Sequence, residues 1–176
     1  MNKENFEEKI LRPDIATELQ KMVDVDQEMR KRSHEEENFW DYEIDKKNTQ
    51  RMREIINEVG FPTISLVGKE GTHNAWLLIQ HADRDIEFQR ECLRLMKEVS
   101  RDEVDVTDLA YLEDRVRINS KQPQLYGTQF TQEGGKHVPL PIEDEENVNE
   151  RRARMGMDTL SDQIKLMYEK YPFRKG

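Results

Sequence analysis

Apolar residues recur every three or four positions along most of this 176-residue chain, with charged residues between them. After Pro13 the apolar positions are Ile15, Leu19, Met22, Val23 and Met29. This spacing matches the 3.6 residues per turn of an α-helix, whereas a half-buried strand would alternate every second residue. Pro13 suits the first position of a helix, because its φ is already helical and its missing N–H is not needed there. The pattern predicts a helix from Pro13 to about Arg32.

Breaker residues divide the rest of the chain into further segments. A second helix is expected from about Trp40 to Val59, ended by Gly60 and Pro62. The short β-branched run 63–67 is a candidate strand, and a loop should follow at 68–71. The periodicity then predicts a long third helix over 73–100 and a fourth that ends near 119. Two helices, at about 144–155 and after Asp158, are expected to close the chain.

Residues 121–142 have a different composition, in which two extended runs flank Gly134 and Gly135. Such a pattern is typical of a β-hairpin or an ordered loop packed on the helices. We therefore predict a mainly α fold. It would be a single-domain helical bundle over residues 1–176, with a small hairpin or extended loop at 121–142 and C-terminal helices at 144–171. The chain lacks a βαβ rhythm and a glycine-rich phosphate loop, which argues against a Rossmann or P-loop fold.

Composition limits the partners and the compartment. The net charge is −9, so the chain lacks the concentrated positive charge that nucleic-acid binding requires. Its longest apolar run, Ala75 to Ile79, is far shorter than the roughly 20 residues needed to span a bilayer. The N-terminus carries charges where a signal peptide would be apolar. One cysteine, Cys92, excludes an intrachain disulfide and fits a reducing cytosol. We expect a cytoplasmic protein that binds neither nucleic acid nor a membrane. The sequence is compatible with a homo-oligomer.

The third predicted helix carries the most informative polar residues. On a helical wheel His81 and Asp85 fall on its broad apolar face, four residues apart and hence adjacent. Asp83 falls on the opposite face. A carboxylate beside an imidazole orients the ring and stabilises its protonated form, as a general base requires. The same pair can equally tether two helices, for instance through Arg115. Metal binding is not indicated, because only His73 and His137 could add imidazoles and neither has a recognisable ligand spacing.

A second group of hydrogen-bonding residues follows the fourth helix. Arg115 lies at the edge of that helix's apolar line, where its guanidinium can bind a carboxylate of the protein or an anionic ligand. Uncharged polar residues then cluster at Gln124, Tyr126, Thr128 and Gln129. Such a segment can line a polar pocket, or its side chains can meet water at the edge of a hairpin.

Several short blocks resemble those of a bacterial family known only as a domain of unknown function. The main blocks are Gln80-His81-Ala82-Asp83, Asp114-Arg115 and Gln124-Leu125-Tyr126-Gly127-Thr128-Gln129. The resemblance covers about residues 12–170 and implies no established activity. It emphasises His81, Asp83, Arg115, Tyr126, Thr128 and Gln129. It also favours Asp83 as the partner of His81, where the helical wheel favours Asp85, so both stay open.

Two functional hypotheses follow from these residues. In the first, the protein is a small acid–base enzyme, such as a hydrolase, that acts on a polar or anionic small molecule without a cofactor or metal. His81 would be the acid or base, Asp85 or Asp83 would orient it, and Arg115, Gln124, Tyr126, Thr128 and Gln129 would bind the substrate. In the second, the protein is a ligand-binding or protein-interaction module, and the same residues form a structural network.

Overall fold

The computed structural model describes residues 10–36 and 39–171 and divides the chain into two compact units, Met1–Asp105 and Val106–Gly176. Each unit is described by itself. Helices dominate both units, and the strands form one small antiparallel hairpin, so the predicted mainly α fold is confirmed. A single domain over the whole chain stays a prediction. No helix in the described residues is long and apolar enough to cross a membrane.

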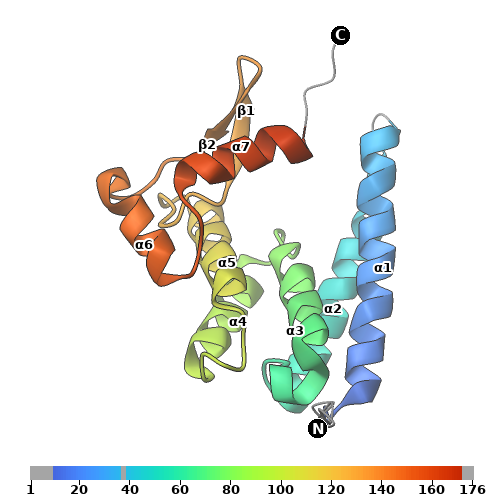
Figure 1. The fold of residues 1–176 in the computed structure, drawn as a ribbon. Helices are drawn as coiled ribbons and strands as arrows, with labels where there is room; N and C mark the ends of the chain where they lie inside the picture. Colours follow the sequence, from blue (N-terminus) through green and yellow to red (C-terminus); the bar gives the residue numbers. More distant parts are fainter. Residues whose placement is uncertain (1–9, 37–38, 172–176) are drawn as a thin grey trace, which may run out of the picture. The chain divides into compact units, whose positions relative to one another are not determined.

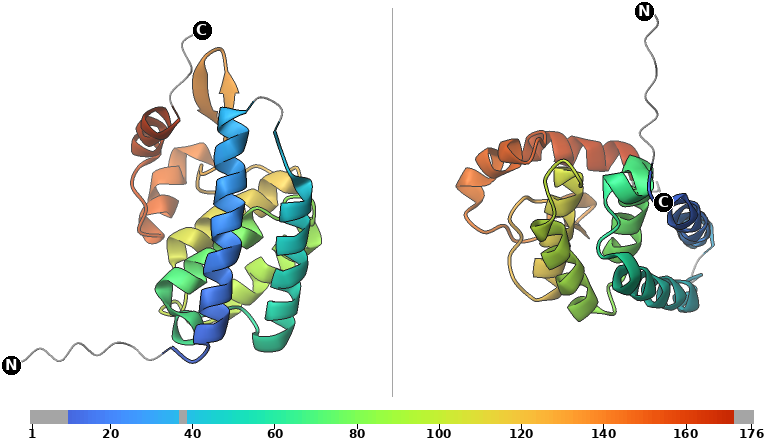
Figure 2. Two further views of the ribbon diagram at one scale, coloured as in Figure 1. Left: turned by 90° about the vertical axis from the view of Figure 1, so that its right-hand side faces the viewer. Right: turned by 90° about the horizontal axis from the view of Figure 1, so that it is seen from below.

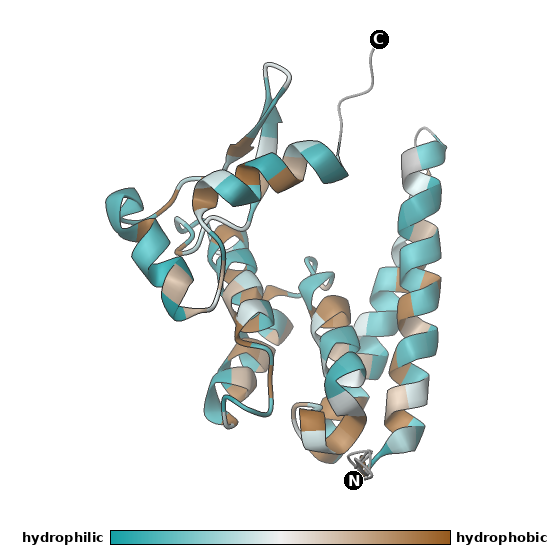
Figure 3. Ribbon diagram, viewed as in Figure 1, coloured by the Kyte–Doolittle hydropathy of each residue, from teal (hydrophilic) through white to brown (hydrophobic). Residues whose placement is uncertain are grey.

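The first unit contains α1 (Pro13–Glu35), α2 (Tyr42–Val59), α3 (Ile64–Gln80) and α4 (Ile86–Glu98), labelled in Figure 1. The predicted first two helices are therefore present, although residues 37–38 of the predicted break between them lie outside the described residues. Helices α1 and α2 run side by side in opposite directions (Figure 2). Most of α1 has the teal of hydrophilic residues in Figure 3, and apolar residues recur between them. The buried apolar residues of the two helices include Leu19 on α1 and Ile55 on α2.

Helices α1 and α3 run in the same direction, and polar contacts join them along their length. At their first residues the Arg12 N–H donates to the Leu66 carbonyl at 2.7 Å. Further along, Asn74 Nδ2 donates to Gln20 Oε1 at 2.8 Å. Apolar side chains of both helices are fully buried, including Leu19 on α1 and Ile79 on α3. This packing brings the C-terminal part of α1 next to the C-terminal end of α3.

The predicted strand at 63–67 and loop at 68–71 are wrong, because these residues begin α3. Gly68 interrupts the helix with φ of +77°, a conformation that glycine adopts without steric cost. Glu103 accepts two hydrogen bonds from the start of α3. The Ile64 N–H donates to the Glu103 carbonyl at 3.0 Å, and the Ser65 N–H donates to the Glu103 carboxylate at 2.9 Å. These contacts satisfy donors that the first turn of a helix leaves free, so tertiary structure outweighs the β propensity of the run.

The predicted long helix over 73–100 is two helices, because α3 ends at Gln80 and α4 begins at Ile86. Asp85 is the N-cap of α4 and accepts a hydrogen bond from the Phe88 N–H at 3.2 Å. The fully buried Gln89 donates its amide to the carbonyls of Ile79 at 3.2 Å and Gln80 at 3.3 Å. The turn at 81–85 is therefore held in place by the helix that follows it.

The second unit contains α5 (Val106–Asn119), β1 (Phe130–Glu133), β2 (Lys136–Pro139), a 3-10 turn η1 (Glu145–Asn147), α6 (Val148–Arg154) and α7 (Leu160–Lys170). The two strands pair antiparallel, with Phe130 opposite Pro139, and Gly134 and Gly135 take positive φ at the turn. The predicted hairpin is present. It packs against α7, where the rings of His137 and Tyr168 meet edge to face with centroids 5.1 Å apart.

Candidate functional site

A histidine and an aspartate meet where the C-terminal part of α1 reaches the end of α3. His81 Nδ1 lies 2.9 Å from Oδ2 of Asp26, whose side chain is buried. Among the residues that the structure describes, Nε2 of the same ring has no hydrogen-bond partner. The His81 side chain is 16% exposed and lines a cleft. A carboxylate at Nδ1 fixes that nitrogen as the donor and leaves Nε2 to exchange a proton.

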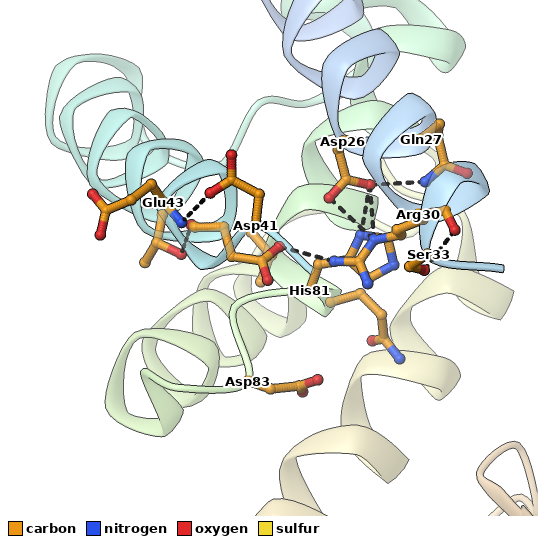
Figure 4. Close-up of polar contacts among 12 residues, drawn as sticks. Asp26, Gln27, Arg30, Ser33, Asp41, Glu43, His81 and Asp83 are labelled. Atoms are coloured by element: carbon orange, nitrogen blue, oxygen red, sulfur yellow. Dashed lines mark hydrogen bonds and ion pairs between the residues drawn. The ribbon is translucent and has the colours of Figure 1, made fainter. Parts of the chain in front are cut away.

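Arg30 completes the arrangement around Asp26, as Figure 4 shows. Its Nε donates to both carboxylate oxygens of Asp26, at 3.1 and 3.2 Å, and one terminal nitrogen donates to Asp45 Oδ1 at 2.9 Å. Gln27 donates its amide to Asp26 Oδ2 at 2.8 Å. Since every partner donates, the Asp26 carboxylate is held in its ionised form.

Arg30 binds two carboxylates, Asp26 and Asp45, and the pKa values of these two groups are shifted in opposite directions. Burial disfavours the charged form of Asp26, but His81 and then Arg30 outweigh it and hold the pKa of this carboxyl below its ordinary value. Burial raises the pKa of Asp45, and Arg30 offsets only part of that effect. Two acids in one site with oppositely shifted pKa values are typical of sites that divide acid and base roles.

The cleft beside His81 has a volume of about 770 Å³, within the range of small-molecule sites. Its walls come from three stretches of the first unit: Arg30 on α1, residues between 40 and 53 on and before α2, and the turn at 81–85. Both aromatic and charged side chains line it. The site therefore combines a fixed imidazole with a cavity large enough for a ligand.

The predicted neighbour of His81 on the wheel, Asp85, is not its hydrogen-bond partner, because the helix ends before either residue. Asp85 instead pairs with Arg53 at 2.6 Å. Asp83 accepts a hydrogen bond from Gln89 at 3.4 Å. All three predicted catalytic residues line the cleft, but the carboxylate that contacts the imidazole is Asp26.

Sequence reasoning missed Asp26, Arg30 and Asp45. The signal for Asp26 was present, because it continues the apolar series of α1 at helical spacing after Leu19 and Val23. A carboxylate at such a position is buried and needs a charged or hydrogen-bonding partner. Nothing local identifies that partner, because His81 is 55 positions away.

The predicted substrate-binding residues belong to the second unit. There the Asp114 side chain is fully buried. Its carboxylate accepts hydrogen bonds from three backbone N–H groups, those of Leu125 at 2.7 Å, Tyr126 at 3.1 Å and Thr128 at 3.0 Å. It also accepts one from the Thr128 hydroxyl at 2.9 Å. Burial raises the pKa of Asp114, and these hydrogen bonds counteract it. Arg115, the residue after Asp114 on α5, is partly buried. The aspartate thus organises the backbone of the 124–129 segment.

Gln124 has a similar internal role. Its amide donates to the carbonyls of Gln129 at 2.9 Å and Leu140 at 2.8 Å, and its Oε1 accepts the Gln129 N–H at 2.8 Å. The Gln129 amide in turn donates to the Thr128 hydroxyl at 2.9 Å. These buried groups are bonded within the unit. Substrate binding by them, and their convergence with His81, stay predictions.

Neither metal nor thiol chemistry is indicated by the described side chains. Within residues 10–36 and 39–171, no group of three or more His, Cys, Asp or Glu side chains is placed to hold a metal ion. His73 is exposed against the Trp76 ring, and His137 Nε2 lies 2.8 Å from the Tyr171 carbonyl. Cys92 is fully buried, which raises the pKa of its thiol and suppresses the reactive thiolate.

Fold and site together define a mainly α protein whose first unit holds a histidine–aspartate pair beside a cleft. Residues 13–175 match the model of a family of unknown function, DUF6624. The chain belongs to this family, which confirms the resemblance to a domain of unknown function. No curated protein and no solved structure matches the chain.

Proposed function

We propose that the cleft of the first unit is the active site of an acid–base enzyme that acts on a polar or anionic small molecule. His81 would be the general base or acid through Nε2, and Asp26 would hold the ring in the required tautomer. One observation carries the proposal: the imidazole has a buried carboxylate at Nδ1 and lines a cleft of ligand size. Positioned imidazoles of this kind speed proton transfer by about 100- to 10,000-fold.

The reaction class that this arrangement supports is hydrolysis or another proton-transfer reaction. Nε2 can take a proton from water or from a substrate carbon or hydroxyl, and the imidazolium that forms is stabilised by Asp26. Asp45, which pairs with Arg30, is a second carboxyl group of the cleft, and burial raises its pKa above the ordinary value. Asp83 and Asp85 lie on the cleft wall, where they contribute to substrate selection.

A second candidate function is ligand binding without turnover. The observation in its favour is the ion-pair network itself, because Arg30 links α1 to α2 through Asp45, and His81 links α1 to α3 through Asp26. A network of this kind can serve to hold three helices together around a ligand pocket. The two functions differ in whether a bound molecule is chemically changed.

The test uses the full chain and two histidine variants. Wild type, His81→Asn and the control His73→Asn, which changes an exposed histidine of α3, are incubated with a metabolite extract that is followed by mass spectrometry. We expect a metabolite that wild type and His73→Asn consume and that His81→Asn consumes at least about 100-fold more slowly. Melting curves of all three proteins verify that they are folded.

Two outcomes would contradict the enzyme proposal. Equal consumption by His81→Asn would remove His81 from catalysis. A metabolite that wild type retains unchanged, and that His81→Asn fails to retain, would instead support the binding module.

A further inference from the structure

Two aromatic side chains on the cleft wall are unusually exposed. Trp40 is 38% exposed and Tyr42 is 52% exposed, and both line the cleft. Their ring centroids are 6.3 Å apart, and the ring planes are inclined by 53°. The two rings therefore do not cover each other face to face. Large aromatic surface that remains open inside a concave site is typical of places where a ligand packs.

Each ring is supported by a guanidinium group. The Arg30 guanidinium lies over the Trp40 ring at 5.0 Å from its centroid, and the Arg84 guanidinium lies over Tyr42 at 4.0 Å. Arg30 is itself fixed by Asp26 and Asp45. A cation over one face of a ring holds the ring in place and leaves the opposite face for a second partner. Planar ligands stack well on such a preorganised surface.

The cations of the cleft differ in how they are neutralised. Arg30 pairs with Asp45 at 2.9 Å, Arg53 with Asp85 at 2.6 Å and Lys46 with Glu43 at 3.6 Å. Arg84 forms no ion pair with any carboxylate in the described part of the chain. Its guanidinium is exposed at the cleft and can donate several hydrogen bonds to an anion. The positive charge available to a ligand is therefore next to Tyr42.

From these contacts we infer that the ligand of the cleft carries a planar aromatic ring and an anionic group. The ring stacks on Trp40, and the anion binds Arg84, whose guanidinium lies over Tyr42. This inference rests on the proposed function only in taking the cleft as a small-molecule site. A volume of about 770 Å³ accommodates both parts in one molecule, such as a nucleoside monophosphate or an aromatic acid.

Calorimetric titration of the full chain tests the inference. The ring-bearing anions are adenosine 5′-monophosphate and indole-3-acetate, and the partial probes are adenosine and ribose 5-phosphate. We expect at least one ring-bearing anion to bind at least tenfold more tightly than both partial probes. Trp40→Leu should weaken its binding roughly 5- to 100-fold, and Trp40→Phe should restore most of the loss, because a planar ring remains.

The charge of Arg84 is tested with a matched pair of variants. Arg84→Gln should weaken the ring-bearing anion at least tenfold and leave adenosine unchanged. Arg94→Gln, a change at an exposed arginine of α4 that pairs with Glu98, should alter neither. Circular dichroism confirms that each variant is folded.

Three results would overturn the inference: no saturable binding of either ring-bearing anion, binding of ribose 5-phosphate equal to that of the best ring-bearing anion, or unchanged binding by Trp40→Leu. None of these three results would by itself contradict the proposed enzyme function. A metabolite consumed in a His81-dependent way would keep the enzyme proposal while the ring inference fails. Conversely, binding of a ring-bearing anion that depends on Trp40 and Arg84, without any His81-dependent turnover, would keep the ring inference while the enzyme proposal fails.

Discussion

Replacing Asp26 with asparagine tests the physical basis of the site without knowledge of its substrate. The variant has nearly the same volume, but it removes the buried negative charge to which His81, Arg30 and Gln27 donate. Breaking a buried ion pair costs about 3–5 kcal/mol when the remaining charge is left alone. Here Arg30 keeps Asp45 at 2.9 Å, so its charge is not left alone. We therefore expect a smaller loss, about 2–3 kcal/mol of unfolding free energy.

Tryptophan fluorescence during urea unfolding measures this loss selectively. Trp40 and Trp76 are the two tryptophans of the chain, and both belong to the first unit. The matched control is Asp24→Asn, because Asp24 is an exposed residue of the same helix that accepts a hydrogen bond from Gln20. Such surface changes alter stability by about 0.5 kcal/mol or less. Equal midpoints for the two variants would refute the reasoning.

The difference between wild type and Asp26→Asn should also depend on pH. The pKa of Asp26 is lowered in the folded protein, so folding favours its ionised form. The stabilisation is then present above the unfolded pKa, near 3.8, and is lost as the pH falls through the lower folded value. We expect the gap between the two unfolding free energies to be full near neutral pH and to shrink below about pH 4. A gap that widens toward acid would contradict the assigned direction.

Two further predictions concern the second unit. Gly127→Ala should destabilise it by about 2–4 kcal/mol in a thermal melt, because φ is +71° and a Cβ would come within 2.7 Å of Leu160. The control Gly134→Ala, with open space around the added Cβ, should cost only about 1–2 kcal/mol. Equal effects of the two substitutions would contradict this packing. Asp114→Asn should speed hydrogen exchange of the Thr128 amide roughly 10- to 100-fold, because that N–H loses a carboxylate acceptor. Unchanged exchange would show that Asp114 does not hold the loop.

Local signals were sufficient for the elements whose ends are marked by special residues. Pro13 begins α1, Gly60 ends α2, and the Gly134-Gly135 pair forms the hairpin turn. The break between α3 and α4 is marked less strongly, by the N-cap Asp85. Residues 81–85 contain neither glycine nor proline, and the apolar pattern continues across them. The break is stabilised by Gln89, whose contacts exist only in the folded unit.

The sequence identified one residue of the candidate site, His81, but not the residue that binds it. His81 could be selected because an imidazole on an apolar face needs a partner. The partner could not be chosen, because the wheel assumed a continuous helix and offered only neighbours in sequence. The cluster at 124–129 was identified as polar, but composition alone does not reveal that its donors and acceptors satisfy one another.

The hydrogen bond between α1 and the end of α3 makes the properties of His81 depend on helix docking. In a chain with α1 detached, the ring would be an ordinary solvated imidazole that exchanges freely between its two neutral tautomers. When α1 docks, Asp26 accepts a hydrogen bond from Nδ1, and this selects the tautomer that carries its proton on Nδ1. Packing of the helix therefore decides whether Nε2 is free to accept a proton. The protonation pattern of that ring, observed by nitrogen NMR, is therefore a direct record of whether α1 is in place.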